Sequence, residues 1–129
     1  MYYLMIWDRY LASIGRDGCL DKVEIPLDVA NFFFRLDVEQ YPILSSLSFD
    51  DYDMFSGAQI DSLVGELCSV ASINPLISET VESMVDIMLK ARALGKNILF
   101  DPFKVDELVQ KRQVEPIKLR AQSRMLIRK

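Results

Sequence analysis

Acidic side chains are the residues of this chain best placed to do chemistry, and three of them gather at Asp50, Asp51 and Asp53. Carboxylate oxygens are the ligands that calcium and magnesium prefer in proteins. An EF-hand calcium loop, however, requires glycine at its sixth position and glutamate at its twelfth, and counting from Asp51 places Ser56 and Ser62 there. The spacing therefore predicts an exposed acidic loop with no metal ion and no cofactor.

The chain contains no histidine, which removes the Ser-His-Asp and Cys-His nucleophiles, the usual imidazole base and every zinc site with an imidazole ligand. Its two cysteines, Cys19 and Cys68, are too few for a four-thiolate zinc site. The five glycines are scattered singly and form neither a dinucleotide fingerprint nor a P-loop. A hydrolase with paired carboxylates is an alternative, but no two acids are singled out as a pair. We therefore predict that the protein is not an enzyme and takes no small-molecule substrate.

The net charge of −4 hides an uneven distribution. Residues 1–110 hold 8 Lys and Arg against 18 Asp and Glu, whereas residues 111–129 hold 7 against 1. An acidic body repels the phosphates of nucleic acid and attracts basic proteins, although solubility alone is another reason for acidity. We therefore predict a basic protein partner, with residues 110–129 as a peripheral basic tail. The alternative is a nucleic-acid-associated regulatory protein that uses this tail.

The start of the chain predicts its compartment. Six apolar residues, Tyr2 to Trp7, are followed at once by charge, and they lack the basic flank and the longer apolar stretch of a signal peptide. No apolar run is long enough to cross a membrane. We expect a cytoplasmic protein with no membrane partner and with reduced thiols at both cysteines. Cys68 lies on an apolar helical face and is expected in the core.

The elements before the acidic loop follow from the spacing of apolar residues. Residues 2–7 predict a buried strand, and residues 22–25 alternate as a half-buried strand that is a candidate to pair with it. Apolar residues recur at helical spacing over 27–36, with Asp28 as a candidate cap. Between 37 and 55, Pro42 and the density of serines and aspartates predict a loop with short helical turns.

Two helices follow the loop. A capping box from Ser56 to Gln59 opens a helix over 58–72, and Asn74-Pro75 opens another over 76–94 that Gly95 ends. Residues 97–100 predict a short central strand, and Asp101-Pro102 opens a last short helix that ends before Pro116, with Val105, Leu108 and Val109 facing inward. The predicted fold class is α+β and mainly helical, with the pair 58–72 and 76–94 packed antiparallel at the centre on a small β-sheet that includes 2–7 and 97–100. Residues 1–129 are expected to form a single domain.

The acidic loop is the candidate partner-binding site, because its aromatic side chains alternate with carboxylates. Aromatic anchors surrounded by charge are typical of protein interfaces and steer an oppositely charged partner. The residues predicted to bind the partner are Asp50, Asp51, Tyr52, Asp53 and Phe55. In the alternative interpretation the loop is merely solvated, with Tyr52 and Phe55 turned inward.

The same region carries a resemblance to a known family. The chain resembles small bacterial immunity proteins of contact-dependent growth inhibition and other polymorphic toxin systems, in a pattern that covers about a third of its length. The pattern comprises Phe33 through Asp37, Tyr41-Pro42, Leu44, Leu47, Asp51-Tyr52-Asp53, Phe55, Gln59, Leu63 and Glu66-Leu67. The resemblance implies a cytoplasmic, non-enzymatic protein that binds and blocks the C-terminal domain of a cognate toxin, often a nuclease with a basic active site.

Overall fold

The computed structural model describes residues 2–103. Within them the elements run β1 (Tyr2–Trp7), α1 (Arg9–Ser13), β2 (Cys19–Ile25), α2 (Leu27–Phe34), the 3₁₀ turn η1 (Leu44–Ser46), β3 (Asp53–Phe55), α3 (Ala58–Ile73), the 3₁₀ turn η2 (Pro75–Ile77), α4 (Ser78–Leu94) and β4 (Asn97–Asp101). The predicted α+β class is confirmed. The basic tail predicted over 110–129 and the helix predicted around Val105, Leu108 and Val109 lie outside the described residues.

The four strands form one antiparallel sheet in the order β2-β1-β4-β3. The predicted strand 2–7 is confirmed, as is its pairing with the strand predicted at 22–25, which extends back to Cys19. The predicted strand 97–100 is also confirmed as a central strand, because β4 lies between β1 and β3. The sequence did not predict β3, since three residues are too short to show an alternating pattern.

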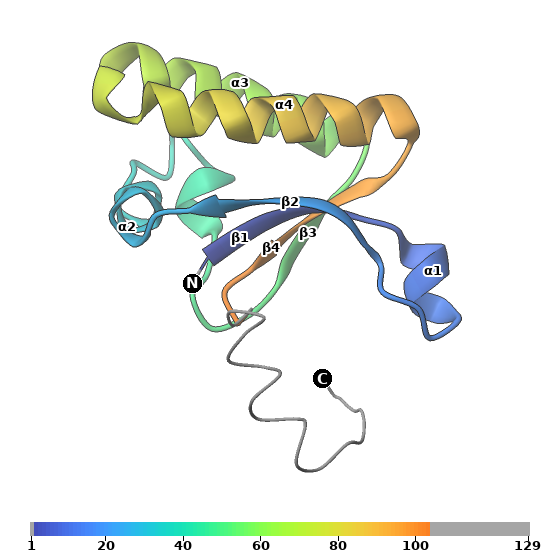
Figure 1. Ribbon diagram of the computed structural model, residues 1–129. Coiled ribbons are helices and arrows are strands. Elements are labelled where there is room, and N and C mark those ends of the chain that lie inside the picture. Colours follow the sequence, from blue (N-terminus) through green and yellow to red (C-terminus); the bar gives the residue numbers. More distant parts are fainter. Residues whose placement is uncertain (1, 104–129) are drawn as a thin grey trace.

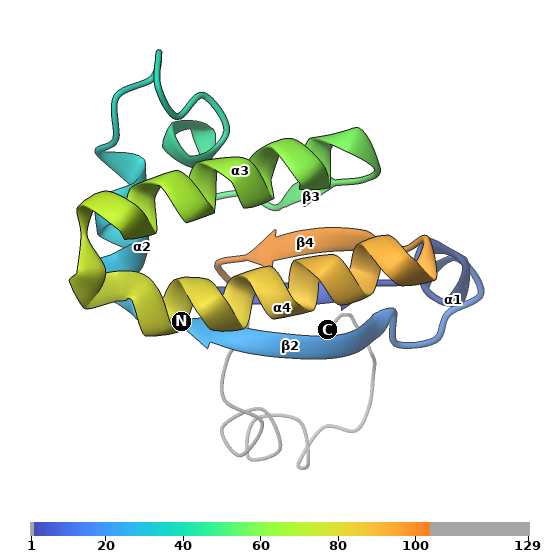
Figure 2. The ribbon, with the colours of Figure 1, turned by 90° about the horizontal axis from the view of Figure 1, so that it is seen from above.

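One face of the sheet carries the helices. Figure 1 shows α3 and α4 across this face, and in Figure 2 they lie side by side. Leu4 and Ile6 of β1 face them and are fully buried, because residues two apart along a strand point to the same side. The helices contribute further buried apolar side chains, namely Ile60, Leu63, Leu67, Val70, Val81, Met84, Ile87, Met88 and Ala91. The core is therefore a layer of aliphatic, methionine and a few aromatic side chains between helices and sheet.

The helix ends differ in detail from the predictions. Gly57 precedes α3, and only half of the capping box forms: Ser56 N donates to Gln59 Oε1 at 3.2 Å, while no side chain caps the helix. Pro26, not Asp28, stands at the start of α2, and the Asp28 carboxylate lies within the first turn. Gly95 ends α4 as predicted, with the positive φ of 69° that glycine tolerates best.

The prediction that Cys68 lies in the core was wrong, because its side chain is exposed on α3. The buried stripe of α3 runs instead through Leu63, Leu67 and Val70, which places Cys68 at the solvent edge of the apolar face. The exposed Cys68 thiol forms no disulfide bond.

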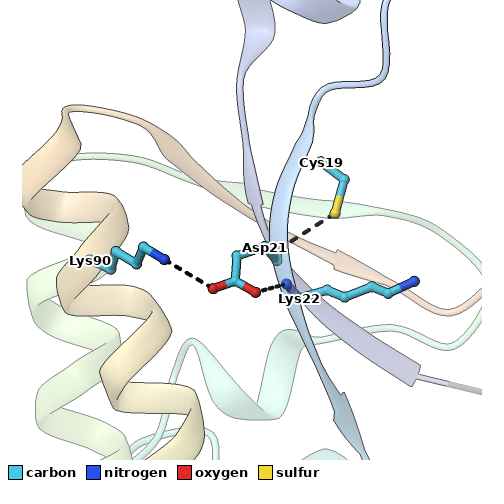
Figure 3. A network of polar contacts seen from close by, with 4 residues as sticks. All are labelled: Cys19, Asp21, Lys22 and Lys90. Atoms are coloured by element: carbon cyan, nitrogen blue, oxygen red, sulfur yellow. Dashed lines mark hydrogen bonds and ion pairs between the residues drawn. The ribbon is translucent and has the colours of Figure 1, made fainter.

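Polar contacts fasten the helices to the sheet and to each other. Lys90 Nζ of α4 lies 3.2 Å from Asp21 Oδ2 of β2, as Figure 3 shows. This contact, together with the N–H of Lys22, lowers the pKa of the Asp21 carboxyl. Arg92 of α4 binds both carboxylate oxygens of Asp61 on α3, at 3.0 and 3.2 Å. No helix within residues 2–103 is long and apolar enough to cross a membrane.

Candidate functional site

The acidic loop, defined as residues 48–55, connects the 3₁₀ turn η1 to the sheet. Its last three residues are β3, which pairs with β4 so that Asp53 lies opposite Phe100 and Phe55 opposite Ile98. Because Ile98 and Phe100 belong to the buried core, Asp53 and Phe55 share the helix-covered face of the sheet. Met54 points to the opposite face and is 41% exposed.

Hydrogen bonds within the loop hold its shape. The N–H of Ser48 donates to Asp53 Oδ2 at 3.0 Å and its hydroxyl donates to Asp50 Oδ1 at 2.8 Å. The N–H of Tyr52 donates to Asp51 Oδ1, also at 2.8 Å. The carboxylates thus bind donors of their own loop, which orders the segment before any partner binds and lowers the entropy lost on binding.

An aromatic cluster anchors the loop to the body of the protein. Phe49 packs against Phe34 of α2, with ring centroids 4.2 Å apart, and lies 6.1 Å from Tyr2 of β1. Tyr2 in turn lies 5.7 Å from Phe34 and 5.9 Å from Phe100. Phe49 is nonetheless 45% exposed, so one side of its ring packs on the body of the protein and the other faces solvent.

A second aromatic pair lies at the surface. Tyr52, which is 52% exposed, meets Phe103 edge to face at 5.1 Å between centroids. Phe103 is 49% exposed and follows β4, where its N–H donates to Asp101 Oδ1 at 2.8 Å. This turn brings a residue far away in the sequence beside the loop, which extends the exposed aromatic surface around the aspartates.

The carboxylates of the loop occupy different environments. Asp50 and Asp51 are exposed, and within residues 2–103 neither forms an ion pair. Asp53 is half-buried, and burial raises the pKa of its carboxyl, opposed by the hydrogen bond from Ser48 and reinforced by the charges of Asp51 and Asp50. Asp50 and Asp51 are therefore the charges that the loop exposes to solvent, whereas Asp53 accepts a hydrogen bond inside the loop.

The predicted binding residues thus divide into two groups. Asp50, Asp51 and Tyr52 share the exposed rim of the loop, while Asp53 and Phe55 are half-buried. Phe55 packs edge to face on Phe100 at 6.0 Å. The sequence reasoning missed Phe49 and Phe103 as exposed neighbours. The acids beside Phe49 were a signal for its exposure, but the position of Phe103 depends on tertiary contacts alone.

A buried hydroxyl lies beneath the loop. Tyr2 is 1% exposed, and its phenolic oxygen has no hydrogen-bond partner among the described residues. Burial raises the pKa of Tyr2, and the nearby carboxylates of Asp53 and Asp101 raise it further. The phenol is therefore neutral at physiological pH, and its burial costs free energy because the hydroxyl has lost the water it would bind in the unfolded chain.

The described chain offers no obvious place for a metal ion. Residues 2–103 contain no group of three or more cysteine, aspartate or glutamate side chains arranged to hold one. Comparison with known proteins finds no matching family model, no matching curated protein and no matching solved structure.

Proposed function

We propose that this protein is an immunity protein, which binds the C-terminal domain of a cognate bacterial toxin and neutralises it. The toxin domain is proposed to be basic and to act as a nuclease. One observation carries the proposal: the ordered acidic loop presents Asp50 and Asp51 next to the exposed rings of Phe49, Tyr52 and Phe103. The resemblance to immunity proteins includes part of the same loop.

The loop has the features that a basic partner requires. Two exposed carboxylates without cationic neighbours in the described chain accelerate association with a positively charged surface. Three half-exposed aromatic rings offer apolar area and stack well on arginine. Because hydrogen bonds already order the loop, little of the binding energy is lost in fixing its shape. Inhibition in this proposal requires only that the loop cover the toxin's active site.

The experiment that tests the function begins with the gene immediately upstream of the gene for this protein, where we expect a toxin C-terminal domain to be encoded. The two chains are produced together and separately, and complex formation, toxin activity and the growth of cells that carry both are measured. We expect a stable complex and restored growth. A toxin domain that neither binds this protein nor loses its toxicity in the protein's presence would overturn the proposed function.

A second experiment tests the loop separately. In Asp50→Asn/Asp51→Asn the shape of both side chains is kept while two negative charges are removed. The matched control is Glu79→Gln/Glu82→Gln, which removes two charges from the start of α4. Loss of a rim charge is worth about 1 kcal/mol or less, so association should slow several-fold in the loop variant only.

A third variant removes the exposed ring. Tyr52→Ala is expected to accelerate dissociation by tenfold or more if Tyr52 is an interface anchor, because such truncations cost about 2 kcal/mol. Unchanged association in the loop variant together with unchanged dissociation in Tyr52→Ala would place the interface elsewhere. That result would leave the function itself to be decided by the growth assay.

A further inference from the structure

The middle of the sheet is apolar on both faces. In β1, Tyr2, Leu4 and Ile6 face the helices, while Tyr3, Met5 and Trp7 point to the other side, here called the second face. An antiparallel sheet with one solvated face normally alternates apolar and polar residues. A strand without any polar residue is instead typical of a sheet that is covered on both sides.

The second face continues from β1 onto β4 and β3. Leu99 lies opposite Met5, and Met54 lies opposite Leu99, so three apolar side chains cross three neighbouring strands. Met5 and Leu99 at the centre are 1% and 6% exposed, whereas Met54 is 41% exposed and Trp7 is half-buried. The apolar area thus extends beyond the part that is already buried.

No helix of the described chain crosses the second face. Figure 1 shows α3 and α4 on the opposite side of the sheet, with α1 and α2 at its two ends, and Figure 2 agrees. The second face is polar at its borders. Lys22 and Glu24 of the edge strand β2 are exposed there, and the Lys22 ammonium lies 5.2 Å from the centre of the Tyr3 ring. Asn97 and Asp101, at the two ends of β4, lie on the same face opposite Trp7 and Tyr3. The polar edge and the apolar centre together resemble the rim and the middle of a docking surface.

We propose that the C-terminal segment, residues 104–129, docks on the second face. The last strand residue, Asp101, lies opposite Tyr3 and so belongs to the second face. The described chain ends two residues later, at the border of this face. The segment has 26 residues, while a sheet of four strands is only about 15 Å across and about 10 helical residues cover that distance. Its length is therefore more than sufficient.

The composition and charge of residues 104–129 also favour docking of this segment on the second face. The segment carries apolar residues at helical spacing, Val105, Leu108 and Val109. It holds 8 Lys and Arg against 3 Asp and Glu, whereas residues 2–103 hold 7 against 16. A segment of charge +5 is attracted to a body of charge −9, and its apolar residues can cover the part of the second face that is still exposed, at Met54 and Trp7.

Trp7 makes the docking measurable, because it is the only tryptophan of the chain and it lies on the second face. Its ring packs on Gly18, where an added Cβ would lie 2.9 Å from the indole carbon Cε2. Since this contact holds the ring in place, access of a neutral quencher such as acrylamide to Trp7 reports what covers the face rather than a movement of the side chain.

The experiment compares three full-length proteins at several protein concentrations. Leu108→Asp/Val109→Asp replaces two apolar residues of the segment by negatively charged ones. The matched control Gln110→Asp/Gln113→Asp adds the same two charges at polar positions. Burying a carboxylate is unfavourable enough to shift the ratio of docked to undocked segment by at least about tenfold. We expect Trp7 to be protected from acrylamide in the wild type and in the control, and to become accessible in Leu108→Asp/Val109→Asp.

Far-UV circular dichroism and thermal unfolding show that each variant keeps the fold, and a variant that does not is replaced by the milder Leu108→Ser. Equal quenching of Trp7 in all three proteins overturns the proposal. Protection that rises with protein concentration and survives Leu108→Asp/Val109→Asp also overturns it, because a second copy of the chain then covers the second face.

Discussion

Replacing Tyr2 by phenylalanine is expected to stabilise the protein. The side chain is 1% exposed, and its hydroxyl has no hydrogen-bond partner within residues 2–103. Its ring contacts with Phe34, Phe49 and Phe100 do not involve the hydroxyl and remain in Tyr2→Phe. The substitution therefore removes a buried polar group without creating a large cavity.

The size of the effect follows from the cost of an unsatisfied polar group. Leaving one buried costs about 1–3 kcal/mol, so the free energy of unfolding of Tyr2→Phe should rise by an amount in that range. For a domain of this length, each kcal/mol corresponds to a rise in melting temperature of about 4 °C. Urea unfolding of both proteins at neutral pH measures the difference, provided that the slope with urea concentration is unchanged.

Tyr41→Phe is the matched control, because it removes the same hydroxyl from a tyrosine that has a partner. Tyr41 is 5% exposed, and its hydroxyl lies 3.2 Å from Ser69 Oγ. Loss of this hydrogen bond should destabilise the protein by about 0.5–1.5 kcal/mol, so the two substitutions have opposite signs. If Tyr2→Phe destabilised the protein as Tyr41→Phe does, the Tyr2 hydroxyl would have a partner and the reasoning would be refuted.

The free energy of unfolding at alkaline pH provides a second measurement for Tyr2. Its pKa is raised in the folded protein, so the stability that it contributes is present below the pKa of the unfolded chain, about 10, and is lost as the pH rises through the folded value. In Tyr2→Phe that part of the loss is absent. The gain in the free energy of unfolding should therefore widen above about pH 10, and a constant gain would argue against the raised pKa.

Two further predictions concern the glycines and Asp53. Gly95→Ala should destabilise the protein by about 1 kcal/mol because φ is positive there, whereas Gly65→Ala inside α3 should stabilise it by about 0.5–1 kcal/mol. Thermal unfolding measures both changes in stability. If both substitutions changed the stability in the same direction, the different backbone roles given to the two glycines would be contradicted. Burial raises the pKa of Asp53, so its contribution to stability is present at low pH and is lost as the pH rises through the folded value. Asp53→Asn keeps an oxygen that accepts from the N–H of Ser48, but it has no carboxyl whose ionisation destabilises the fold. The stability of Asp53→Asn relative to the wild type should therefore increase with pH across the acidic range. A difference in stability that does not change with pH would refute the raised pKa of Asp53.

Much of the fold was predictable because local patterns determine it. The strand 2–7 and the helix predicted over 58–72 appear with almost the same bounds, since a dense apolar run and a helical stripe act over neighbouring residues. Gly95 was predictable as a helix end for the same reason. The burial of Cys68 was predicted wrongly, because this residue lies at the border of the apolar face of α3. Periodicity alone does not say how far the neighbouring elements extend over that face.

The candidate site was predictable as a segment but not as a surface. Acids and aromatics in a short stretch predict an exposed loop, and Asp50, Asp51 and Tyr52 are exposed. The burial of Asp53 and Phe55 depends on the pairing of β3 with β4, which a three-residue strand does not announce. Phe103 joins Tyr52 only because the chain returns to the loop through the sheet.

The amino-acid sequence by itself determined the absence of histidine chemistry, the acidic body, the position of the acidic loop in the chain and the main helices and strands. These properties depend on composition and on residues a few positions apart. Tertiary structure alone decided which carboxylates are exposed, that the Tyr2 hydroxyl is buried, and that the apolar second face of the sheet has no helix of the described chain over it. Such features arise from contacts between distant segments, and their geometry is set by strand register and helix packing rather than by local preference.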